Sequence, residues 1–167
     1  MENIVIYDTL GIEEIELFSK LINTVFDEFV GNDYSVEGNN TFKDYIKPQN
    51  IMEILKNSEN KFFVAKYNNE IIGVLQIRNK GHIALFFVKK EFHNKGIGKN
   101  LFGNYLEMLK KENIGINIVT VNSSIYAENI YSKMGFIKVN EIQEKNGIKY
   151  IPMEYKIWKN GLRPYFV

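Results

Sequence analysis

The feature that most constrains the fold is a double change of hydrophobic period between residues 82 and 121. Residues 82–88 (HIALFFV) are a short apolar run, typical of a strand. Over residues 96–111 the apolar side chains instead recur at helical spacing, as Ile97, Leu101, Tyr105, Met108 and Leu109. Residues 114–121 (IGINIVTV) are strand-like again. A strand–helix–strand unit crosses over in the right-handed sense, so these two strands are predicted to be parallel.

The sequence on either side of this unit predicts further strands and helices. The helices expected are 11–30, 41–57 and 123–134, and the remaining strands are 4–8, 61–67, 71–78, 136–144 and 148–157. Residues 31–40 are polar and rich in Gly and Asn, which indicates a loop. Pro152 indicates an edge or a bulge in the last strand. The order β-α-α-β-β-β-α-β-α-β-β favours an α/β fold of the α+β type, with helices on a mixed sheet.

Length and composition narrow the classes of function. The chain of 167 residues predicts one domain, 1–167, in which the tail 158–167 is not placed. It has no Cys, which excludes disulfides and Cys nucleophiles and leaves no metal site expected. The net charge of +1 argues against a nucleic-acid partner. The longest apolar run is too short for a membrane span, and the N-terminus lacks a leader pattern, so a cytoplasmic protein with no membrane partner is expected.

Residues 85–102 carry the clearest chemical signal. An apolar strand leads through a polar connection to Gly96-Ile97-Gly98, which opens the amphipathic helix. The first turn of a helix offers unpaired N–H groups and the positive end of the dipole. Two glycines without Cβ let a phosphate approach this backbone, and Lys95 and Lys99 add positive charge. We therefore expect an anion site here.

A simpler interpretation of the same glycines stays open. Gly96 can serve only a tight turn, and Gly98 can serve only close packing of the helix on the sheet. The pattern is not a dinucleotide fingerprint, because Leu101 stands where the third Gly is required. It is not a P-loop either, because the Gly-Lys-Ser/Thr ending is absent.

A second segment, residues 121–136, makes the combination more specific. It runs from a strand into a short helix and a Gly-Phe exit. With the first segment, it resembles the GNAT-type acetyl-CoA-dependent N-acetyltransferases. The family's pyrophosphate motif matches His93-Asn94-Lys95-Gly96-Ile97-Gly98, although His93 replaces the usual Arg or Gln. The family's later motif matches Asn122, Tyr131, Gly135 and Phe136.

The resemblance implies a GNAT-like fold, with splayed central parallel strands, and acetyl-CoA as co-substrate. Phe86, Phe87 and Val88 would then offer backbone groups to the pantetheine arm and the thioester. The pyrophosphate would lie on residues 93–99, which are His93, Asn94, Lys95, Gly96, Ile97, Gly98 and Lys99. Asn122 and Asn129 would lie along the other side of the arm, although Asn129 can equally be a solvated helix residue.

The reaction implied is direct attack of a neutral amine on the thioester. Tyr131 stands at the family's general-acid position and would protonate the departing thiolate. A backbone N–H near Phe87 would bind the oxyanion. His82 and Glu37 are the candidate bases. For both the alternative is structural, His82 bonding to backbone at a strand end and Glu37 being a solvated loop charge, with water as the base.

The acceptor is not identified by the sequence. Tyr34, Phe42 and Tyr45 are expected to line its pocket, and Asp33, Glu37 and Asp44 would make the mouth acidic and suit a small cationic amine. A peptide amine is an alternative acceptor. Other functions that stay open are a catalytically silent acyl-CoA-binding regulatory module and a nucleotide-phosphate-binding protein. The chain is expected to be a monomer or a homodimer, with Trp158 and Phe166 as candidates for a dimer surface.

Overall fold

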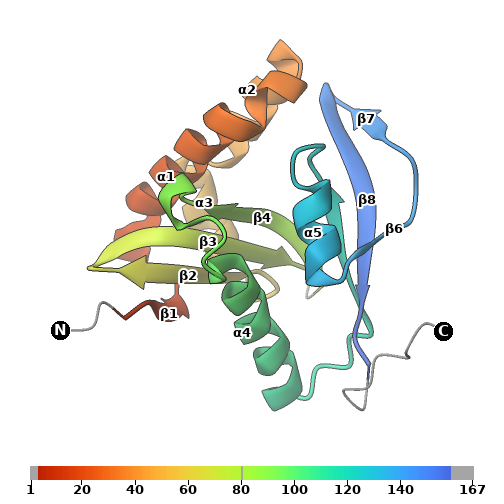
Figure 1. Cartoon of the computed structure of the whole chain (residues 1–167). Helices are drawn as coiled ribbons and strands as arrows, with labels where there is room; N and C mark the ends of the chain where they lie inside the picture. Colours follow the sequence, from red (N-terminus) through yellow and green to blue (C-terminus); the bar gives the residue numbers. More distant parts are fainter. Residues whose placement is uncertain (1–3, 80, 159–167) are drawn as a thin grey trace.

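The fold is built on one twisted mixed sheet, seen in a computed structural model that describes residues 4–79 and 81–158 (Figure 1). Its strands are β1 (Ile6–Thr9), β2 (Lys61–Tyr67), β3 (Glu70–Arg78), β4 (His82–Val88), β5 (Ile118–Ser123), β6 (Ile137–Lys138), β7 (Gln143–Lys145) and β8 (Ile148–Lys156). They are ordered β1-β2-β3-β4-β5-β8-β6, and β7 also pairs with β8. Among the described strands, only β4 and β5 pair in parallel, as the crossover predicted.

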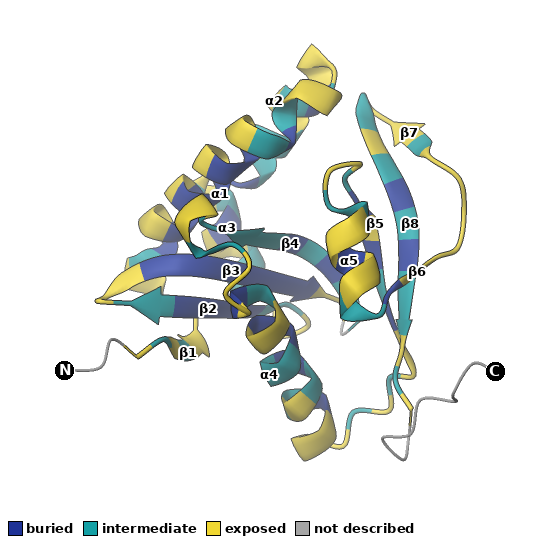
Figure 2. Cartoon of the chain, viewed as in Figure 1, coloured by how far each residue is buried: buried dark blue, intermediate teal, exposed yellow. Residues whose placement is uncertain are grey.

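Helices cover both faces of this sheet. One face carries α1 (Ile15–Phe29), α2 (Val36–Tyr45) and α3 (Pro48–Leu55), and the other carries α4 (Ile97–Lys111) and α5 (Glu128–Met134). In Figure 2 the buried stripes of these helices turn toward the strands. The stripe on α1 is the one that its sequence predicts, with Ile15, Phe18, Leu21, Ile22, Val25 and Phe26 buried.

The parallel strands β4 and β5 separate soon after they meet. They pair only at His82 with Thr120 and at Ile83 with Val121, after which β4 runs on alone toward Val88. On its other side β4 bulges at Ala84, because Gln76 of β3 pairs with Leu85 while Ile77 pairs with Ile83. The expected splayed pair is therefore present, and it leaves one edge of β4 open inside the molecule.

Several boundaries differ from the sequence prediction, and hydrogen bonds at the segment ends explain two of them. Residues 36–40 are helical rather than a loop, because the Ser35 hydroxyl caps α2 by accepting from the Gly38 N–H at 3.0 Å. The helix expected from residue 123 begins only at Glu128. The Ser124 hydroxyl accepts from the Ala127 N–H at 3.2 Å and holds the preceding residues in a turn.

The C-terminal strands are also shorter or more broken than predicted. Strand β5 begins at Ile118 instead of residue 114, and the strand expected at 136–144 is divided into β6 and β7. Pro152 explains that division. The Val139 N–H donates to the Pro152 carbonyl at 3.0 Å, so the Pro152 ring nitrogen also faces the 136–144 segment. Because this nitrogen has no hydrogen to donate, the pairing is interrupted there. The predicted hairpin turn at Asn146–Gly147 is confirmed, with both residues at positive φ.

None of the helices within residues 4–79 and 81–158 is both long enough and apolar enough to cross a bilayer. Phe166, one of the two aromatic residues considered for a dimer surface, lies outside the described part of the chain, whereas Trp158 is exposed.

Candidate active site

A cavity of about 810 Å³ opens where β4 and β5 separate. Its walls come from the end of β4, the start of α4, the β5–α5 connection and the end of α1 with the start of α2. Eleven sequence-predicted site residues line it: Phe86, Phe87, Val88, His93, Asn94, Gly96, Ile97, Gly98, Lys99, Asn122 and Tyr131. Lys95, Asn129, His82 and Glu37 are not among the lining residues.

One end of the cavity is the N-terminus of α4. The first hydrogen bond within α4 runs from the Asn100 N–H to the Gly96 carbonyl, at 3.0 Å. The N–H groups of residues 97–99 therefore have no acceptor within the helix. Gly96 has φ of +78°, and no atom lies within 4 Å of the position a Cβ would take. A Cβ on Gly98 would lie 3.4 Å from the Phe86 ring. The backbone here is thus accessible at Gly96, while Gly98 also serves packing on the sheet.

His93 ties the β4–α4 connection back onto the strand. Its Nε2–H donates to the Val88 carbonyl at 2.8 Å, which fixes the ring tautomer because a carbonyl only accepts. The ring centre of His93 lies 5.3 Å from that of Phe29. Lys95 turns its ammonium over Phe92, 5.1 Å from the ring centre, while Lys99 lines the cavity. Of these two lysines, Lys99, in the first turn of α4, is therefore the one that adds positive charge to the cavity.

The hydrogen-bond pattern of β4 decides which backbone groups face the cavity. The Lys89 N–H donates to the Ile72 carbonyl at 2.8 Å, so in this antiparallel register Phe87 is also bonded to β3. The backbone groups of Phe86 and Val88 consequently point away from β3, toward the gap left by β5. The candidates for the oxyanion donor expected near Phe87 are therefore the N–H groups of Phe86 and Val88, because the N–H of Phe87 is bonded to β3.

Tyr131 is held in the cavity wall by aromatic contacts. It sits on α5, is 7% exposed, and its ring centre lies 6.0 Å from that of Phe86 and 5.2 Å from that of Phe136. Burial, and secondarily the nearby Tyr34 phenol, raise the pKa of Tyr131 well above its usual value. Its phenol is therefore protonated at neutral pH and able to donate a proton.

The two candidate bases lie away from this wall. His82 is at the start of β4, where its Nδ1 is 2.7 Å from the Thr120 hydroxyl. Burial, followed by the Arg78 charge, lowers the pKa of His82 to about 4. Glu37 is exposed in the first turn of α2, where its charge favours the helix dipole. Both contacts differ in detail from the structural alternatives considered, because His82 contacts a side-chain hydroxyl rather than backbone, and Glu37 lies in a helix rather than a loop.

The acceptor side of the cavity differs from the expected one. Tyr34 and Phe42 line it, but the Tyr45 hydroxyl bonds with the Gln76 amide at 2.8–3.0 Å and faces a second cavity. Asp33, Glu37 and Asp44, which were expected to make the mouth acidic, do not line the cavity, although Asp33 directly precedes Tyr34, which does. The sequence analysis also missed several lining residues: Phe29, Ser124, Tyr126 and Lys133. Phe29 had a detectable signal, since it ends the apolar stripe of α1.

The protein is an α/β protein with a mixed sheet whose one parallel pair is splayed, and the cavity in the gap has a helix N-terminus at one end and a buried phenol in its wall. Residues 30–157 match the family described as Acetyltransferase (GNAT) domain. The chain belongs to this family, and it is an acyltransferase. The predicted family and fold are thereby confirmed.

Solved structures of the same fold are distant in sequence. One described as the GCN5-related N-acetyltransferase "Aminotransferase, Class-II" from Rhodopseudomonas palustris is 18% identical with a TM-score of 0.76, over 94% of this chain and 99% of that one. A PaiA N-acetyltransferase from Thermoplasma acidophilum, solved in complex with coenzyme A, is 19% identical with a TM-score of 0.74, over 92% and 99%. No curated protein matches the chain.

Proposed function

We propose that this protein transfers the acetyl group of acetyl-CoA to a primary amine by direct attack of the amine nitrogen. The observation that carries the proposal is the single cavity between β4 and β5, which joins the start of α4 to Tyr131. A diphosphate suits the first end and a departing thiolate suits the second. The cavity therefore has the two features that a long thioester co-substrate requires.

The residues present fit acetyl-CoA as that co-substrate. The pyrophosphate would be held by the N–H groups of residues 96–99 and by Lys99, since Gly96 leaves the space beside it open. The pantetheine arm carries amide groups, which can pair with the backbone groups of Phe86 and with the N–H of Val88, whose carbonyl already accepts from His93. The Thermoplasma acidophilum protein of the same fold was solved in complex with coenzyme A, which supports a ligand of this kind.

The chemical step forms one bond and breaks one. The amine nitrogen bonds to the thioester carbonyl carbon, and the carbon–sulfur bond then breaks to leave an amide and the thiolate of CoA. A backbone N–H of Phe86 or Val88 stabilises the oxyanion formed in between. Tyr131 donates its phenolic proton to the thiolate, a role supported by its place in the wall of the cavity.

The proton lost by the amine goes to solvent in this proposal. His82 and Glu37 do not line the cavity, and no carboxylate is among its described lining residues. A water chain from the open side of the cavity is the remaining path. We expect His82→Gln and Glu37→Gln to leave the pH–rate profile unchanged.

The test of the proposal is Tyr131→Phe, assayed by thiol release from acetyl-CoA with a panel of amines and by the mass of the product. Loss of a general acid typically lowers kcat by about 10²–10⁴-fold, while affinity for CoA stays the same. Tyr150→Phe is the matched control, because its hydroxyl bonds to Gln143 on the β7–β8 hairpin, at 2.9 Å, and does not line the cavity. Full kcat in Tyr131→Phe refutes the assigned role, and thermal protection by ATP but not by CoA refutes the co-substrate.

A further inference from the structure

The cavity has an aromatic wall on the side away from α4. This wall consists of Phe29 at the end of α1, Tyr34 and Phe42 on the α1–α2 hairpin, and Phe87 of β4. The Phe87 side chain packs with the core under α1, whereas Phe86 and Val88 pack with the core under α4. The aromatic wall thus faces the thioester position from the side opposite the pyrophosphate site.

The aromatic wall is built to keep its shape. Phe42 stacks on the buried ring of Phe26, with ring centres 4.0 Å apart and planes at 14°, and its centre is 6.0 Å from that of Phe87. Phe29 stacks in turn on Tyr126 of the β5–α5 connection, with ring centres 4.9 Å apart. Packed aromatic pairs of this kind hold a fixed surface for an apolar group.

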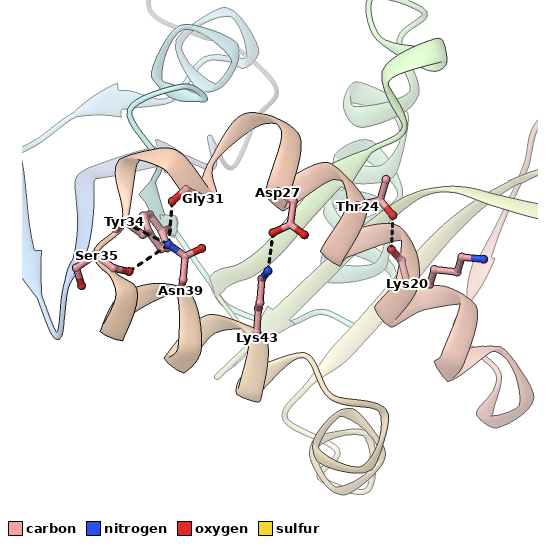
Figure 3. Close-up of polar contacts among 8 residues, drawn as sticks. All are labelled: Lys20, Thr24, Asp27, Gly31, Tyr34, Ser35, Asn39 and Lys43. Carbon is pink, nitrogen blue, oxygen red and sulfur yellow. Dashed lines mark hydrogen bonds and ion pairs between the residues drawn. The ribbon is translucent and has the colours of Figure 1, made fainter.

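Polar contacts behind the wall fix the backbone that carries Tyr34. In Figure 3 the Asn39 side-chain amide donates to the carbonyls of Gly31, Tyr34 and Ser35, at 2.9–3.2 Å. The Lys43 ammonium lies 2.8 Å from the Asp27 carboxylate, and this ion pair, drawn as a dashed line in the same figure, joins α2 to α1. Tyr34 is therefore positioned before any ligand binds.

The charges around the wall argue against a polycation. Among the described lining residues the charged side chains are Lys99 and Lys133, and none is Asp or Glu. Three carboxylates near the hairpin are already paired, Asp27 with Lys43, Asp44 with Lys47 and Glu28 with Lys90. Asp33 and Glu37 of the hairpin are exposed and do not line the cavity. A polyamine entering this cavity would lose hydration without gaining a carboxylate partner.

Building on the proposed function, we infer that the acceptor is a monoamine whose amino group is carried on an aryl or bulky alkyl group, and that the aromatic wall binds this group. Burial of the apolar group against fixed rings supplies the binding, and it places the single amine next to the thioester. A hydrophobic pocket typically discriminates about tenfold or more per methylene. We expect kcat/KM for phenethylamine to exceed that for spermidine by at least roughly tenfold.

The test compares the two amines on the wild-type protein and on a matched pair of variants. Ile130 and Ile125 are both exposed, at 46% and 39%, but only Ile130 lines the cavity. Ile130→Glu adds a carboxylate to the cavity without disturbing the core. We expect it to lower the phenethylamine-to-spermidine ratio of kcat/KM by roughly fivefold, the scale of one exposed ion pair. Ile125→Glu is expected to leave that ratio unchanged.

The outcomes separate this inference from the proposed function. A preference for phenethylamine, lowered by Ile130→Glu only, supports the inference. Equal use of the two amines, or a preference for spermidine, overturns it and leaves N-acetyl transfer standing. If the protein binds acetyl-CoA but acetylates neither amine nor any other primary amine in the panel, the proposed function fails and the inference fails with it.

Discussion

Gly38→Ala tests the close contact between α2 and the β7–β8 turn. Gly38 is buried in the first turn of α2, where α2 meets the β7–β8 turn (Figure 1). The Ser35 N–H donates to the Gly147 carbonyl at 2.9 Å across this contact. A Cβ on Gly38 would lie 2.7 Å from the Gly147 carbonyl carbon and closer still to its oxygen, so the two backbones must separate.

The expected magnitude follows from three opposing terms. Forcing the backbones apart costs about 1–3 kcal/mol, as overpacking does elsewhere. Loss of the Ser35–Gly147 hydrogen bond adds about 0.5–1.5 kcal/mol. The better helix propensity of Ala returns up to about 1 kcal/mol. Together these terms predict that Gly38→Ala lowers the free energy of unfolding by about 0.5–4.5 kcal/mol. Each kcal/mol corresponds to roughly 2–4 °C in Tm for a chain of this size.

The assay is urea unfolding followed by circular dichroism, with Gly103→Ala as the control. Gly103 lies in the middle of α4, and nothing lies within 4 Å of the position of its Cβ. There the propensity gain is unopposed, so Gly103→Ala is expected to raise stability by up to about 1 kcal/mol. If Gly38→Ala proves as stable as Gly103→Ala, the tight contact between α2 and the β7–β8 turn is not present in solution.

Two further predictions concern the histidines. Burial, and then the Arg78 charge, lower the pKa of His82 from 6.5 to about 4, so the unfolded chain binds the proton at a higher pH than the folded chain does. The stability that depends on neutral His82 is therefore complete above pH 6.5 and is lost as the pH falls from there to 4. We expect the free energy of unfolding in urea to differ less between pH 7.5 and pH 5 in His82→Gln than in wild type. His93→Ala removes the donor to the Val88 carbonyl, so we expect a higher KM for acetyl-CoA with little change in kcat; an unchanged KM would show that this bond does not position the β4–α4 loop.

The sequence predicted well what depends on local hydrophobic period. The stripe of α1, the meander of β2, β3 and β4, and the crossover to a parallel β5 each follow from spacing along a short segment. The glycine at φ of +78° before α4 also follows from local chemistry, since only Gly takes that backbone freely. These features were predictable because nothing distant in the chain decides them.

What the sequence did not predict depends on partners far apart in the chain. The segment 36–40 is polar and would suit a loop, but the Ser35 cap and the contact with Gly147 make it the first part of a helix. The acidic side chains expected at the acceptor mouth were assigned from composition alone. Asp44 pairs with Lys47, while Asp33 and Glu37 are exposed and do not line the cavity, which spacing within a ten-residue segment does not reveal.

The separation of β4 from β5 connects the fold to the chemistry. An interior strand edge with unpaired N–H and C=O groups is costly unless a ligand or water bonds to them. The bulge at Ala84 lies at one end of this edge and the His93 contact at Val88 lies at the other. The folded protein therefore carries the free-energy cost of the open edge before a ligand binds. In the proposed reaction those same groups pair with the pantetheine arm and the oxyanion. The proposed reaction thus uses backbone groups on the edge of β4 that β5 leaves open, and the continued β4–β5 pairing of an ordinary parallel sheet would occupy that edge.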